Sequence, residues 1–190
     1  DQVSYNNFSM SPLLDQERLG LFFEKLSREI RSGVTVYLTG GTVLIYHGIR
    51  PATTDIDFGF DATDPIDRES LPELAQRVAG SDIRVQCSEE MSGWSLMPLP
   101  KYRERALLLG RYGRLTVKSI HPVDLILAKV HRGYAEDFAD GKALVGHFKI
   151  SLEEIGVRFK EILAAYPAST EKGEFRQRFE RFLQLLQEGK

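Results

Sequence analysis

Cysteine and long apolar runs are the scarcest features of this sequence. Its 190 residues include one cysteine, Cys87, which excludes an internal disulfide and a thiolate cluster for zinc or iron–sulfur. The longest apolar stretches, at 107–109 and 125–127, fall far short of the roughly 20 residues that span a bilayer. We therefore expect a protein of the reducing cytoplasm that has no membrane partner.

An excess of charge of one sign is also lacking. The formal net charge is −2, with 27% charged and 42% hydrophobic residues, which is typical of a globular domain and excludes a disordered chain or a coiled coil. Two segments of opposite charge cancel in this net charge. Residues 55–90 carry ten acidic and three basic residues, whereas residues 101–132 carry eight basic and two acidic residues. A local basic surface is therefore compatible with the small net charge.

The first two thirds of the chain show an α/β pattern. Apolar spacing predicts an amphipathic helix from Ser11-Pro12 to Gly33. Strands are predicted at 34–38, 54–60 and 83–87, with helices at 43–47 and 65–79 between them. A hairpin is predicted from strands at 103–109 and 114–120 around a turn at 110–113.

The last third of the chain is helical in pattern. Helices are predicted from His121-Pro122 onward, at 134–145, at 155–166 after a Ser151/Glu154 capping box, and at 171–187. We expect three parts: an N-terminal helix at 1–33, an α/β core at 34–120 and a helical part at 121–190. The fold class is α/β (α+β), a small mixed sheet flanked by helices with a C-terminal helical segment.

Asp55 and Asp57 are the strongest chemical signal. They alternate with Ile56 and Phe58 on a predicted strand, so both carboxylates point to the same face, about 6 to 7 Å apart at Cα. Two such carboxylates repel one another, and a shared divalent cation, Mg2+ or Mn2+, would relieve the repulsion. An edge strand with an exposed acidic face would show the same pattern.

A glycine turn, Gly40-Gly41-Thr42, lies a dozen residues upstream between a predicted strand and a predicted helix. Glycine lets backbone N–H groups approach a ligand closely, and a helix N-terminus favours negative charge, so this turn can hold a phosphate. A tight turn that needs positive φ would also explain the glycine pair.

Together, the Gly-Gly-Thr turn and the Asp-x-Asp strand resemble the signature of the polymerase-β-like nucleotidyltransferase superfamily. The stretch from Tyr37 to Phe58, with its arginine before the aspartates, resembles the abortive-infection (AbiEii-type) toxin branch of that superfamily. A second segment, at 121–140, is similar to the helical segment of this branch, which carries a lysine and then an aspartate pair. The two matches frame residues 34–145 and imply a minimal nucleotidyltransferase fold.

The resemblance also implies an activity and its residues. Members transfer a nucleoside monophosphate from an NTP to a hydroxyl acceptor, here an RNA such as tRNA, and a toxin of this branch has an antitoxin protein as partner. It implies that Asp55, Asp57 and Lys129 are catalytic, that Asp55 and Asp57 bind metal, that Gly40, Gly41, Thr42, Lys129 and Arg132 bind nucleotide, and that Asp137 and Asp140 support the site. Lys129 could equally be an ordinary solvated helix lysine.

The third metal-binding carboxylate of the superfamily has no clear counterpart. The predicted strands at 83–87 and 114–120 contain no acid, and Glu104 is the one acid on a predicted strand in the right region. Glu104 is therefore a candidate metal ligand, although its arginine neighbours also fit an exposed ion pair. If it is not a ligand, the alternative is an inactive nucleotidyltransferase-fold protein that binds nucleotide or a partner.

Residues 101–132 are the candidate contact with an RNA acceptor. Their basic side chains could bind phosphates without sequence preference, and Tyr102 and Tyr112 could stack on a base. Solvated faces with tyrosines packed inside would give the same composition.

Overall fold

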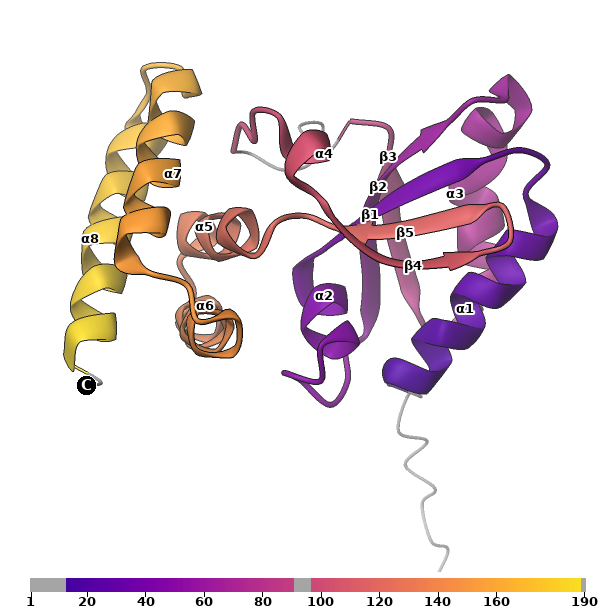
Figure 1. Ribbon diagram of the computed structural model, residues 1–190, viewed down its shortest axis with the longest axis horizontal. Coiled ribbons are helices and arrows are strands. Elements are labelled where there is room, and N and C mark those ends of the chain that lie inside the picture. The colour runs from indigo at the N-terminus through magenta and orange to yellow at the C-terminus, as the bar shows by residue number, and fades with distance from the viewer. Residues whose placement is uncertain (1–12, 91–96, 189–190) are drawn as a thin grey trace, which may run out of the picture.

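A computed structural model describes residues 13–90 and 97–188 of the chain. A five-stranded mixed sheet is flanked by helices and followed by a lobe of helices, which confirms the α/β class (Figure 1). The strands are β1 (Val34–Thr39), β2 (Asp55–Ala62), β3 (Arg84–Ser88), β4 (Leu107–Tyr112) and β5 (Leu115–Ser119). The helices are α1 (Gln16–Glu29), α2 (Gly40–Tyr46), α3 (Pro65–Ala79), α4 (Tyr102–Arg105), α5 (Pro122–Arg132), α6 (Ala135–Phe148), α7 (Leu152–Ala165) and α8 (Thr170–Glu188).

The sheet has the order β3-β2-β1-β5-β4. β1 is antiparallel to β2 and parallel to β5, while β2 is parallel to β3. Thr39 at the end of β1 pairs with Asp57 near the start of β2, and Leu38 pairs with Ser119 at the end of β5. The chain therefore enters α2 from β1, and the linker to α5 from β5, at the edge of the sheet where the two aspartates lie.

The two faces of the sheet differ in chemistry. Val36, Phe58 and Val117 share an apolar face, because residues paired across strands point the same way. Helices α1 and α3 pack against each other and against the strands on this side. The opposite face carries polar residues such as Asp57 of β2 and Gln86 of β3, so the candidate site lies on the face away from α1 and α3.

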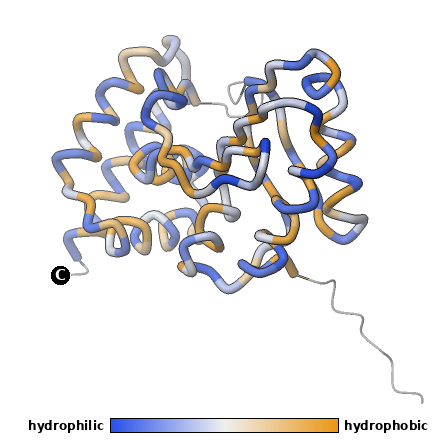
Figure 2. The backbone as a smooth tube through the Cα atoms, turned by 45° about the vertical axis from the view of Figure 1, so that its right-hand side comes forward, coloured by the Kyte–Doolittle hydropathy of each residue, from blue (hydrophilic) through white to orange (hydrophobic). Residues whose placement is uncertain are grey.

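The C-terminal helices form a lobe around α5, which packs on α6, α7 and α8 (Figure 1). Apolar and polar stretches are interspersed along the backbone of the molecule (Figure 2). The phenylalanines at helical spacing in α8 are buried, and Phe159 of α7 stacks on Phe179 at 3.7 Å between ring centroids. Within the described residues, no helix has the length and apolar character needed to cross a membrane.

Several predicted boundaries were wrong. α1 begins at Gln16, capped by Asp15, and the predicted start at Ser11-Pro12 lies outside the described residues. α2 begins directly at Gly40 instead of at 43. Residues 102–105 are helical, and the strand expected there begins at Leu107 and runs through the turn predicted at 110–113. The reversal occurs at Gly113-Arg114, where Gly113 supplies a φ of 54°.

Two polar connections join the helical lobe to the sheet. Asp124 of α5 is fully buried and accepts hydrogen bonds from Arg158 Nε at 2.5 Å and, more weakly, from Arg105 Nε at 3.4 Å. Arg158 also donates to the carbonyl of Pro100 at 2.8 Å. On the other side of α5, Arg50 from the α2–β2 loop binds Asp140 of α6 at 2.8 Å. These contacts fix α5 relative to the aspartates.

The buried Asp124 pair should be essential for stability. We expect Asp124→Ala to lower the free energy of unfolding by about 3 to 5 kcal/mol, because Arg158 would lose its buried partner and keep only the half-exposed Glu161 as a counter-ion. Urea unfolding measures this change. The control Asp82→Ala removes an exposed carboxylate and should stay within about 0.5 kcal/mol of the wild type; equal effects of the two changes would contradict the assignment.

Candidate functional site

Asp55 and Asp57 lie on a strand, as the sequence predicts. Both lie at the start of β2 and alternate with Ile56 and Phe58, which are fully buried on the apolar face. Across the sheet, Asp57 has Thr39 of β1 on one side and Gln86 of β3 on the other. The carboxylates therefore share the polar face, between the start of α2 and the strand β3.

Asp55 is held by two neighbouring side chains. Its Oδ1 accepts a hydrogen bond from Thr53 Oγ1 at 2.8 Å, and its Oδ2 lies 3.5 Å from Arg84 Nη2. Arg84 is two thirds exposed, so its ion pair with Asp55 is a weak one. Asp55 is therefore oriented from within the structure by Thr53.

The surroundings of Asp57 disfavour the ionised form of its carboxyl group. Burial and the neighbouring Asp55 carboxylate raise its pKa to about 6, while Arg84, Arg132 and Lys129 act in the opposite direction. Its Oδ1 is buried and has no hydrogen-bond partner among the described residues. A buried carboxylate oxygen without a partner, next to a second carboxylate, fits the ligand set of a divalent cation.

The basic residues of the predicted site lie on α5 and form a cluster with two aspartates of α6. Lys129 is almost completely buried, and its Nζ lies 2.6 Å from Asp140 Oδ2 and 3.6 Å from Asp137 Oδ1. Arg132 donates to Asp137 Oδ1 and leaves the rest of its guanidinium exposed. Lys129 is therefore not a solvated lysine. Asp140 and Asp137 hold these two cations.

Arg50 is a residue of this cluster to which the sequence assigned no role. It binds Asp140 Oδ1 through both Nε and Nη2 at 2.8 Å, while Lys129 binds the other oxygen of the same carboxylate. The only signal in the sequence was an arginine shortly before the aspartates. Its partner, 90 residues further along the chain, became visible only in the folded structure.

The prediction of Glu104 as a metal ligand rested on a strand that is not there. Glu104 lies on the short helix α4 and is exposed to solvent. Among residues 13–90 and 97–188, no group of three His, Cys, Asp or Glu side chains is arranged to hold a metal ion. The neighbour of Asp57 on β3 is the neutral Gln86, so the carboxylates present could hold one divalent cation more readily than two.

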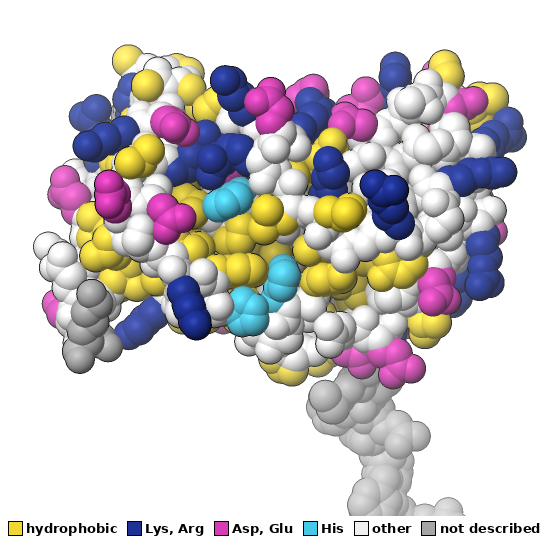
Figure 3. Space-filling model, in the orientation of Figure 1, with side chains coloured by type: hydrophobic (Ala, Val, Ile, Leu, Met, Phe, Trp, Pro, Cys, Tyr) yellow, Lys and Arg dark blue, Asp and Glu magenta, His cyan; other side chains and the backbone are white. Residues whose placement is uncertain are grey.

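The predicted basic stripe at 101–132 is largely engaged within the protein. Arg103 pairs with Asp61 and Glu90, and Arg105 pairs with Asp124. Tyr102 packs against Tyr37, and Tyr112 against Phe23, with ring centroids 5.7 and 5.4 Å apart. Figure 3 accordingly shows basic and acidic side chains interspersed on the face in view. The structure therefore supports a packing role for these two tyrosines.

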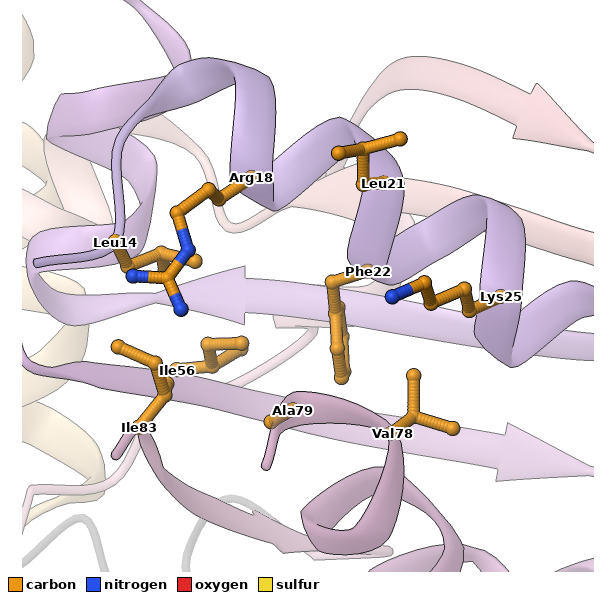
Figure 4. Close-up of a pocket in the computed structure, with 9 residues that line it drawn as sticks. All are labelled: Leu14, Arg18, Leu21, Phe22, Lys25, Ile56, Val78, Ala79 and Ile83. Atoms are coloured by element: carbon orange, nitrogen blue, oxygen red, sulfur yellow. The ribbon is translucent and has the colours of Figure 1, made fainter. Parts of the chain in front are cut away.

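A separate pocket lies on the other side of the sheet. It is lined by Phe22 and Arg18 of α1, Val78 of α3 and Ile56 of β2 (Figure 4). Ile56 points away from the face that carries Asp55 and Asp57, so this pocket is not part of the candidate site.

No protein-family model matches the chain. Searches of curated proteins and of solved structures also find no match.

The raised pKa of Asp57 predicts that this residue destabilises the fold. Between pH 3.8 and about 6 the unfolded carboxyl ionises while the folded one stays protonated, so the wild type loses stability as the pH rises through this window. Without divalent metal, Asp57→Asn should therefore be more stable than the wild type by about 1 to 3 kcal/mol near pH 7.5.

Urea unfolding from about pH 4 to 8 tests this expectation. The advantage of Asp57→Asn should grow with pH up to about pH 6 and then level off. Asp82→Asn, which changes an exposed carboxylate in the loop before β3, is the control. A destabilised Asp57→Asn at neutral pH would show that the carboxylate is not in an unfavourable place.

Proposed function

We propose that the protein transfers a nucleoside monophosphate from an NTP to a hydroxyl acceptor, with a divalent cation held by Asp55 and Asp57. The observation that carries the proposal is the environment of Asp57. Its side chain is partly buried and lies beside a second carboxylate, and its buried Oδ1 has no hydrogen-bond partner in the described structure. Such perturbed carboxylates are costly for folding and cluster at functional sites.

The cation and the basic residues near Asp57 would each contribute charge to the reaction. A divalent cation in this place would neutralise phosphate charge and lower the pKa of the acceptor hydroxyl. The acceptor oxygen forms a bond to the α-phosphorus as the bond to the pyrophosphate oxygen breaks, and the hydroxyl proton passes to solvent. Arg132, more than half exposed, would bind the leaving phosphates. Lys129 would act by its charge alone, because Asp140 holds its Nζ.

We propose an RNA acceptor, such as tRNA, and an antitoxin protein as partner. Both rest on the resemblance of 37–58 and 121–140 to the toxin branch. The basic side chains at 101–132 offer little support, since several of them are paired within the protein.

The alternative is a protein of this fold that binds nucleotide without chemistry. One observation favours it: the polar face has Gln86 beside Asp57, and no third carboxylate joins the pair within the described residues. Such a protein would bind an NTP and Mn2+ without releasing pyrophosphate.

Incubation with Mg2+, each α-labelled NTP and total RNA tests the first proposal. We expect one NTP to label RNA, and Asp57→Asn to reduce the labelling on the order of 100-fold or more, because a metal ligand is lost. Asp82→Asn, which changes an exposed carboxylate in the loop before β3, should keep most of the activity. Undiminished labelling by Asp57→Asn would remove the assigned role.

The same samples separate the two functions. Pyrophosphate release that requires Asp57 supports transfer, whereas NTP and Mn2+ binding without any pyrophosphate supports the binding protein. Label on the protein itself would replace RNA by a protein hydroxyl as the acceptor.

A further inference from the structure

Gly40, Gly41 and Thr42 each lie against β2 or the residues just before it. A Cβ atom on Gly40 would lie 2.6 Å from Asp57 Oδ2, closer than real Cβ atoms approach other atoms. Gly40 also has a φ of +62°, which side chains rarely adopt. The carboxylate of Asp57 is therefore packed directly on the bare backbone of Gly40.

Gly41 makes room for the residue that orients Asp55. A Cβ atom on Gly41 would lie 3.0 Å from Thr53 Oγ1. The same hydroxyl donates to Asp55 Oδ1 at 2.8 Å. A larger residue at position 41 would push Thr53 and, with it, the Asp55 carboxylate.

Thr42 binds the backbone that carries both aspartates. It is fully buried, and its Oγ1 accepts a hydrogen bond from the Asp57 N–H at 3.2 Å. The hydroxyl also donates to the Asp55 carbonyl at 3.4 Å, a long bond. The one hydrogen of this hydroxyl is therefore engaged inside the protein. A contact with a phosphate would require Thr42 to break this bond and to reach the solvent.

We propose that Thr42, together with Thr53, positions the carboxylates of Asp55 and Asp57, and that its hydroxyl does not bind a phosphate. This inference rests on the proposed function, in which those carboxylates hold a divalent cation. The role of the Gly-Gly-Thr turn is then to shape the cation site. Gly40 and Gly41 leave space for the Asp57 and Thr53 side chains, and Thr42 fixes the backbone of β2.

The variants Thr42→Val and Thr42→Ser test this role, with Thr35→Val of β1 as a matched control. Valine keeps the shape of threonine without the hydroxyl, and serine keeps the hydroxyl. Amide hydrogen exchange of Asp57 reports the backbone bond without any metal or nucleotide. We expect Thr42→Val to accelerate this exchange at least tenfold, and Thr42→Ser and Thr35→Val to leave it unchanged.

Mn2+ binding and metal-free NTP binding distinguish the two roles of the hydroxyl. A positioning role predicts that Thr42→Val weakens Mn2+ binding about tenfold, with rescue by Thr42→Ser and with metal-free NTP binding unchanged. A phosphate-binding role predicts the reverse, and that result would overturn the proposal. If Thr42→Val does not fold, Thr53→Val, which removes the bond to Asp55 Oδ1, should weaken Mn2+ binding to a similar extent.

The proposed function and this inference can fail separately. A wild type that does not bind Mn2+ contradicts the cation site of the proposed function, whereas Asp57 exchange still decides whether Thr42 holds the strand. Unchanged exchange in Thr42→Val overturns the inference even if Mn2+ binds.

Discussion

The antiparallel pairing of β1 with β2 is the constraint on which the candidate site depends. It sets Thr39 opposite Asp57, so the chain leaving β1 must turn immediately beside a partly buried carboxylate. Only a residue without a side chain can make that turn, and Gly40 does so at positive φ. A slip of the register by one residue would point both aspartates into the apolar core.

Helix α5 carries two buried charged side chains, Asp124 and Lys129, which connect the sheet region to the helical lobe. Asp124 lies in its first turn and Lys129 near its end, an order that also suits the helix dipole. Each charge is satisfied by residues from elsewhere: Arg158 and Arg105 for Asp124, Asp140 and Asp137 for Lys129. Buried charges must be paired, and this requirement fixes how α6 and α7 pack on α5 and where Lys129 stands relative to Asp57.

The secondary-structure prediction was wrong in a short segment that has no clear helical or strand periodicity. Residues 102–105 mix charged and aromatic side chains, and the pattern allowed a strand; the structure forms one helical turn that buries Tyr102 against Tyr37. The mistaken strand had placed Glu104 in the candidate site, and the helical turn removes it. Gln86 was overlooked for a related reason, since its place beside Asp57 follows from strand pairing and not from any motif.

The sequence by itself determined that Asp55 and Asp57 share one face, because alternation along a strand is a local property of the backbone. It also determined most of the helices and strands, through the spacing of apolar residues. Only the tertiary structure decided the partners of each polar group: Asp57 against Gly40, the Thr42 hydroxyl on β2, and Lys129 between two aspartates. These contacts join residues that lie 8 to 17 positions apart, and packing selects them through burial and charge, which no local pattern encodes.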